Sequence, residues 1–254
     1  MAKFTAVAGA SVPSVETHPA GHRTVGLHRA RLLSPPGFRL WLVMLEFDDG
    51  GAIESGGGEA LYVFEGEVSA DGRTCPTGGA IVVEPGVDAR LEARGAVRAA
   101  HFGARHQAPA ADGPLGPPAA EGRGVHVVGP RGTWTSGRLE HVDAVWFTDS
   151  TCPTCRIALF LVSAAGAHHG PSHSHTQDEI IYLIDGSLRM GAHRFGPDTA
   201  LCIPGGTRYA LEGLAGGHRF LNFRTDVSFQ TSAGYPPLLE TAAAREGAYV
   251  GDIR

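Results

Sequence analysis

Lysine is almost absent from this chain of 254 residues. Lys3 is the single lysine among its 21 basic residues. A Walker-type phosphate-binding loop needs a lysine, and a pyridoxal phosphate enzyme needs a lysine in its core to form a Schiff base. Because Lys3 lies in the N-terminal segment, the sequence excludes both classes of enzyme.

The chain also lacks an excess of basic residues and any long apolar run. Its net charge is −5, so we expect no surface for nucleic acid or anionic lipid. Apolar runs such as 40–45 and 157–165 fall short of the ~20 residues of a membrane-spanning helix, and the first ten residues are a poor secretory signal. We therefore expect a cytoplasmic protein that binds a small-molecule substrate and forms a homodimer, with no nucleic acid or membrane partner.

Cysteine is scarce, with four residues in the whole chain. Cys152 and Cys155 form the only close pair, which is too little for a disulfide framework or a zinc ribbon. A thioredoxin-like pair would open a helix after a strand, whereas this pair precedes the strand-like run RIALFLV. We expect a plain loop at this position.

Glycine and proline are plentiful, at 36 and 17 residues, and a repeat of about 120 residues shows how they are used. The segment GEALYVFEGEV (58–68) aligns with DEIIYLIDGSL (178–188), which places Glu59 over Glu179 and Gly66 over Gly186. Further on, VVEPG aligns with LCIPG and VRAAHF with HRFLNF. Both copies are short β runs between turn residues, as in antiparallel barrels.

The repeat predicts two all-β domains. We expect an N-terminal arm (1–34), a first barrel (35–104), a connector with flanking strands (105–150), a second barrel (151–227) and a C-terminal tail (228–254). The segment 104–124 has the proline, glycine and alanine content of a connector without a core.

Metal-binding residue types are concentrated at the start of the second copy. His173 and His175 are two residues apart, and Glu179 follows four residues later. Alternate residues of a strand share a face, so the three side chains are expected to converge inside a barrel. Two imidazoles and a carboxylate with open positions favour Fe(II), with Mn, Ni, Zn or Cu as alternatives.

This spacing resembles the first motif of the cupin family, G(X)5HXH(X)3–4E(X)6G, with Gly186 as its last residue and Ala167 in place of its first glycine. The second motif, G(X)5PXG(X)2H(X)3N, matches at the turn Pro204-Gly205-Gly206. The resemblance implies a bicupin, with two jelly-roll barrels and one divalent transition metal ion per chain.

Tyr209 stands where the second motif has its histidine, and Gly213 replaces the asparagine. Three roles are open for Tyr209: a fourth metal ligand, a proton donor near the substrate, or packing alone. A nearby cation would favour the phenolate, so Tyr209 and Glu179 are the candidate catalytic residues beside His173 and His175.

The first copy has lost both motif histidines, because Ile53 and Ser55 take their places. We therefore expect a degenerate barrel without metal, serving as scaffold, dimer surface or lid. Glu59 and Arg90 occupy the remaining ligand positions, which predicts a buried ion pair between them. His101 is expected to be an ordinary core histidine.

The sequence favours a metalloenzyme of the oxygenase type that uses the second barrel to act on a small polar or aromatic molecule. A non-redox enzyme is the first alternative, namely an isomerase, a lyase or a hydrolase like ureidoglycine aminohydrolase. The second alternative is a non-catalytic metal- or ligand-binding protein. The fold alone does not select among them.

Overall fold

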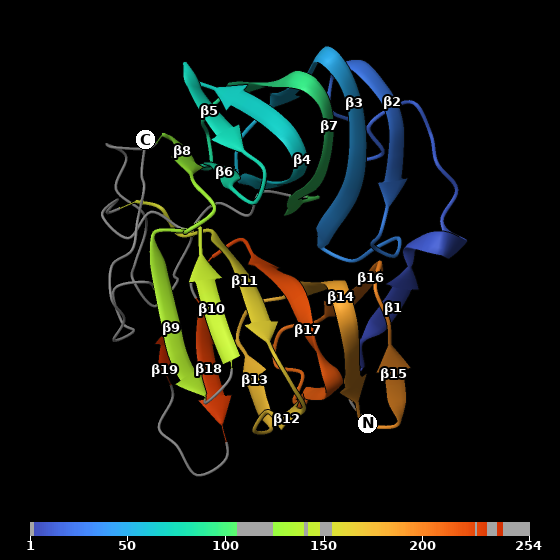
Figure 1. Ribbon diagram of the computed structural model, residues 1–254, viewed down its shortest axis with the longest axis vertical. Helices are drawn as coiled ribbons and strands as arrows, with labels where there is room; N and C mark the ends of the chain where they lie inside the picture. The colour runs from blue at the N-terminus through green and yellow to red at the C-terminus, as the bar shows by residue number, and fades with distance from the viewer. Residues whose placement is uncertain are drawn as a thin grey trace.

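Two antiparallel β barrels form the chain, one above the other in Figure 1. The computed structural model describes residues 3–105, 124–139, 142–147, 154–226, 228–232 and 238–240. Within these ranges the single helix is the short 3-10 turn η1 (Gly9–Ser11), and no helix could span a membrane. The prediction of an all-β fold with two barrels is confirmed.

The first barrel is a seven-stranded sheet in the order β2-β3-β7-β4-β6-β8, with β5 paired to β4. Its strands are β2 (Thr24–Leu32), β3 (Leu40–Ser55), β4 (Glu59–Ala70), β5 (Arg73–Pro76), β6 (Ala80–Val83), β7 (Ala89–Ala104) and β8 (Val125–Val128).

The second barrel combines a nine-stranded sheet, β1-β16-β14-β17-β11-β10-β9 with β12 on β17 and β15 on β14, and a three-stranded sheet, β13-β18-β19. Its strands are β1 (Thr5–Ala8), β9 (Trp134–Leu139), β10 (Val142–Trp146), β11 (Ala158–Ala164), β12 (His168–His169), β13 (His173–His175), β14 (Glu179–Met190), β15 (His193–Phe195), β16 (Thr199–Ile203), β17 (Glu212–Arg224), β18 (Ser228–Ser232) and β19 (Leu238–Glu240).

Segments outside the two repeats complete both barrels. The N-terminal strand β1 pairs with β16 of the second barrel, and β8 pairs with β6 of the first barrel. Strands β9 and β10 extend the second barrel through β11. The arm and the connector therefore contribute strands that cover sheet edges, which would otherwise expose unpaired backbone groups.

The two copies of the repeat fold alike, since β4 and β14 each have 12 residues. Gly66 and Gly186 have φ values of 82° and 77°, a region that favours glycine. A Cβ atom on Gly186 would lie 2.1 Å from the carbonyl oxygen of Gly217. The aligned glycines are thus required by a close approach of neighbouring strands.

The central strands are apolar on both faces because each strand separates two cores. In β3, Leu42 packs in a core shared by the two barrels, whereas Val43 packs inside the first barrel. In β14, Ile180 belongs to the shared core and Ile181 to the interior of the second barrel. Strand alternation therefore decides which side chains enter each barrel.

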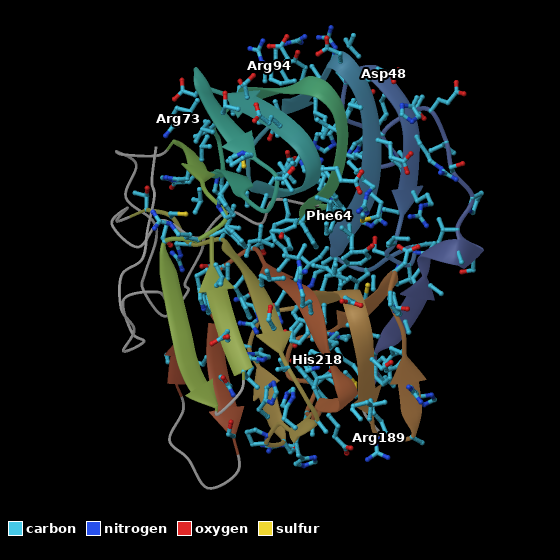
Figure 2. All side chains as sticks on the ribbon, viewed as in Figure 1. Asp48, Phe64, Arg73, Arg94, Arg189 and His218 are labelled. Carbon is cyan, nitrogen blue, oxygen red and sulfur yellow. The ribbon has the colours of Figure 1, made fainter. Side chains whose placement is uncertain are left out.

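Aromatic rings and ion pairs join the barrels. Phe102 of the first barrel stacks on Phe223 of the second with 5.1 Å between ring centroids. Phe64, labelled at the junction in Figure 2, lies 6.1 Å from the ring of Tyr182. The ion pairs are Arg31–Asp198 at 2.8 Å and Arg39–Asp178 at 2.7 Å.

Candidate functional site

Each barrel interior receives polar side chains from the strands that line it. Leu61 and Val63 face the first interior, so Glu59 on the same strand also points inward. His101 shares its face with Ala99, which packs in the same core. In the second barrel the same alternation turns Glu179, Asn222 and Arg224 inward, as their burial shows.

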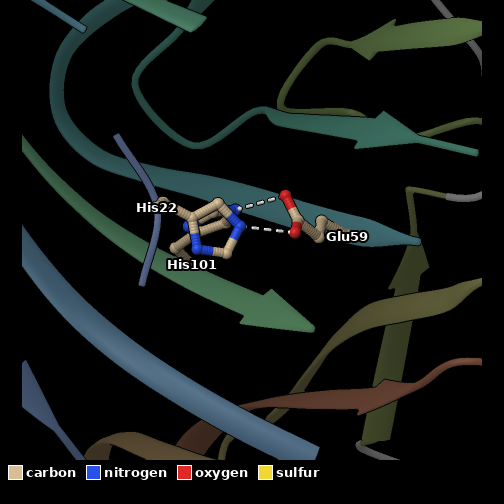
Figure 3. Close-up of side chains that lie close together, drawn as sticks. All are labelled: His22, Glu59 and His101. Carbon is tan, nitrogen blue, oxygen red and sulfur yellow. Dashed lines mark hydrogen bonds and ion pairs between the residues drawn. The ribbon is translucent and has the colours of Figure 1, made fainter. Parts of the chain in front are cut away.

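The first barrel holds a compact group of His22, Glu59 and His101 (Figure 3). The Nε2 atom of His22 is 2.5 Å from Oε1 of Glu59, and the Nε2 atom of His101 is 3.3 Å from Oε2. His22 comes from the arm before β2, whereas Glu59 begins β4 and His101 lies in β7. Three separate segments thus bring two imidazoles and one carboxylate together.

His18 and Ser55 support this group. Ser55 donates a hydrogen bond of 2.5 Å to Oε2 of Glu59. The Nε2 atom of His18 is 3.1 Å from Nδ1 of His101. The backbone N–H of Ala20 donates to Nδ1 of His18, so a neutral His18 carries its proton on Nε2 and donates it to Nδ1 of His101. The proton of a neutral His101 then lies on Nε2, facing Glu59, and a metal ion bound to Nε2 would displace it.

Burial controls protonation in this cluster. It lowers the pKa of His18 to about 2, helped by the neighbouring His101 and His22, and it also lowers the pKa of His101. Burial by itself would raise the pKa of Glu59, but the close approach of the His101 and His22 imidazoles outweighs it, so the pKa lies below its usual range. The carboxylate is therefore ionised beside two neutral imidazoles, His18 and His101.

The donor atoms of His22, Glu59 and His101 all lie within 4.8 Å of one another, and no other such group of three occurs in the part of the chain that the structure describes. The Nε2 atom of His101 is buried and makes no well-formed hydrogen bond to a described residue. An imidazole–carboxylate set with such an atom fits a divalent transition metal ion. The expectation that the first barrel lacks a metal site is therefore not supported.

The predicted ion pair between Glu59 and Arg90 is wrong. Arg90 instead pairs with Glu54 at 2.5 Å, and about half of each of these two side chains is exposed. Glu54 and Arg90 are opposite residues of β3 and β7, on the outer face of the sheet. The charge of Glu59 is compensated by imidazoles because the arm, which the repeat does not include, inserts His22.

In the second barrel the structure brings His175, Glu179 and Tyr209 together. The hydroxyl of Tyr209 donates to Oε1 of Glu179, and Nε2 of His175 lies 3.9 Å from the same oxygen. His173 is half-buried, with its ring 4.5 Å from that of Tyr209, and its Nδ1 is 2.8 Å from the carbonyl oxygen of Pro171. These four residues do not form a metal group as tight as that of the first barrel, so their role as ligands stays a prediction.

Two further residues surround Glu179. Asn222 donates to Oε2 at 2.9 Å, and Arg224 donates to the same oxygen at 3.1 Å. Burial would raise the pKa of Glu179, but the neighbouring His175 and Arg224 and the hydrogen bonds from Tyr209 and Asn222 lower it below its usual range. Both carboxylate oxygens therefore already accept hydrogen bonds.

Sequence reasoning missed His18, His22 and Arg224. His101 could have been found because it is a histidine within the strand-like run VRAAHF, but no local sequence feature distinguishes His18 and His22 of the arm. Of the predicted loop at Cys152 and Cys155, Cys155 is half-buried, and Cys152 lies outside the described residues.

No protein-family model matches the chain, and no curated protein matches its sequence. Among solved structures, Bacillus subtilis oxalate decarboxylase aligns with a TM-score of 0.65 and 14% identity over 92% of this chain and 80% of that one. The same enzyme has Mn(II) centres. Procruciferin, an 11S globulin from Brassica napus, aligns with a TM-score of 0.61 and 11% identity over 87% of this chain and 86% of its own. These likenesses show the fold alone: the chain has the fold of two cupin jelly-roll barrels.

Proposed function

We propose that this chain is a metal-dependent cupin enzyme that acts on a small molecule. Its divalent metal ion is held in the first barrel by His22, Glu59 and His101. The observation that carries the proposal is the convergence of three donor atoms within 4.8 Å in a buried site. Because the three segments that supply them are far apart in sequence, the convergence is a product of the fold.

The proposed reaction is of the oxygenase type. Two histidines and one carboxylate are the ligands of many non-haem Fe(II) oxygenases, and they leave coordination positions open. A bound Fe(II) ion would supply a Lewis acid and a site for oxygen chemistry.

The neighbouring residues have positioning roles in this proposal. Ser55 and His18 hold Glu59 and His101 through the hydrogen bonds described above. Trp41 forms one wall, with its ring 4.8 Å from that of His101. His22 is the most exposed ligand, at 12% of its side chain, so a substrate would reach the metal ion from its side.

A second candidate is a manganese-dependent reaction without net oxidation. The likeness to oxalate decarboxylase, which has Mn(II) centres, favours it. The same donor set accepts Mn(II), since imidazole and carboxylate both bind this ion. A non-catalytic binding protein is a further candidate, favoured by the likeness to procruciferin.

Metal analysis of protein purified without chelators tests the proposal. We expect about one transition metal ion per chain in the wild type and little in Glu59→Gln. Glu54→Gln is the matched control, because this residue lies on the outer face and pairs with Arg90. Metal that is retained in Glu59→Gln but lost in Glu179→Gln would overturn the proposal and would support a site in the second barrel.

The reaction type is tested on the metal-loaded protein. Oxygen uptake by the Fe(II) form in a screen of small carboxylic and phenolic acids would support the oxygenase. Release of carbon dioxide from oxalate by the Mn(II) form, without net oxygen uptake, would support the second candidate. Metal binding with neither reaction would favour the binding protein.

A further inference from the structure

Arg224 places a positive charge in the polar interior of the second barrel. Its Nη2 atom lies 3.1 Å from Oε2 of Glu179 and 3.2 Å from Nε2 of His175. Only 2% of the Arg224 side chain is exposed. These two partner atoms belong to residues that the sequence predicts as metal ligands, and a metal ion bound to them would lie in the same space.

The position of Arg224 follows from the register of β14 and β17. Ile180 is opposite Phe223, so Glu179 and Arg224 are the next opposite pair of these antiparallel strands. A guanidinium on this strand therefore reaches the carboxylate directly. Phe160 lies beneath it, with its ring centre 5.6 Å from the guanidinium carbon.

The first barrel has a different arrangement at the equivalent positions. Ala60 is opposite Phe102 in β7, so Glu59 is opposite Gly103. Trp41 is the β3 partner of Gly103, and its indole lies 2.3 Å from where a Gly103 Cβ would be. An indole and a glycine thus replace the Ala158–Arg224 pair of the second barrel.

We propose that Arg224 is the internal cation of the second barrel, where it occupies the space between Glu179 and His175 and competes with divalent metal ions. The Glu179–Arg224 pair is neutral, so an added divalent ion would leave two uncompensated positive charges in a buried site. In the first barrel, Glu59 has no arginine partner among the described residues, so the same ion would leave only one uncompensated positive charge. The proposal concerns a different barrel from the proposed function and does not depend on it.

Cobalt(II) titrations test the competition, with the visible absorption of the bound ion and calorimetry as readouts. All variants carry Glu59→Gln, so that the result does not depend on metal binding in the first barrel. Removing the charge with Arg224→Ala or Arg224→Gln should tighten binding by about 100-fold, since breaking a buried ion pair has an effect of this order. Arg224→Lys keeps the charge and should leave the affinity near that of Glu59→Gln alone.

A further substitution locates the ion. Adding His175→Ala to the Arg224→Gln variant should cancel the gain in affinity. Equal affinities with and without Arg224, or a gain that survives His175→Ala, would overturn the proposal. Because Arg224→Gln keeps most of the side-chain volume and a donor group, it provides the test if Arg224→Ala does not fold. Circular dichroism and thermal unfolding establish that each variant is folded.

Discussion

Replacing His218 with leucine is expected to stabilise the protein and to reduce its sensitivity to acid. His218 lies on β17 and faces the interior of the second barrel (Figure 2), where 3% of the residue is exposed. Its ring stacks on those of Phe220 and His168, at 5.7 and 4.9 Å between centroids. Neither ring nitrogen has a hydrogen-bond partner among the described residues. The imidazole thus loses its hydration on folding without replacing it.

The magnitude follows from two contributions. A buried polar group without a partner costs about 1–3 kcal/mol, which the leucine side chain avoids. Burial, with a smaller effect of His168, also lowers the pKa of His218 from 6.5 to about 4. Between these values the unfolded chain binds a proton that the folded chain does not, so the wild type loses stability as the pH falls from 6.5 towards 4. From this pKa difference, the free energy of unfolding of the wild type falls by at most about 2 kcal/mol at pH 5. This is an upper value because partial solvation of the ring reduces the effect.

Urea denaturation and calorimetry at pH 7.5 and pH 5 measure both contributions. We expect His218→Leu to raise the free energy of unfolding by about 1–2 kcal/mol at pH 7.5 and by up to about 2 kcal/mol more at pH 5. Each kcal/mol corresponds to about 2–4 °C in Tm for a chain of this size. His169→Leu is the matched control, since His169 is exposed on β12 and should change stability by less than about 0.5 kcal/mol. A difference between His218→Leu and wild type that does not grow on acidification would refute the reasoning.

Two further predictions concern backbone geometry and thiol chemistry. Gly186→Ala should destabilise the protein by more than about 2 kcal/mol in urea denaturation, because the added Cβ would lie 2.1 Å from the carbonyl oxygen of Gly217. Gly191→Ala is the control, since Gly191 also has a positive φ but has open space around it, and it should cost about 1 kcal/mol. Equal losses of stability in the two variants would contradict this prediction. Burial raises the pKa of both Cys75 and Cys202 to about 12, so neither thiol should react with iodoacetamide at pH 8 until the protein unfolds. Mass spectrometry of the labelled native protein measures this, and modification of either cysteine would contradict the prediction.

Part of the polar interior of the second barrel was predictable from the sequence because the residues concerned follow local rules. His173, His175 and Glu179 lie within seven residues, and Tyr209 follows the turn after Pro204. The alternation of side chains along a strand then turns Glu179 inward. Arg224 was not predictable in the same way, since its contact with Glu179 depends on the pairing of β14 with β17.

The sequence by itself determined the all-β class, the duplication and the aligned glycines Gly66 and Gly186, because each follows from the local spacing of apolar and turn residues. Only the tertiary structure decided the partners of the buried carboxylates. The arm places His22 on Glu59, and a cross-strand register places Arg224 on Glu179. The physical reason is that a buried charge must be compensated by a group that tertiary packing brings next to it. Such groups come from segments that are distant in the sequence, so no local motif identifies them.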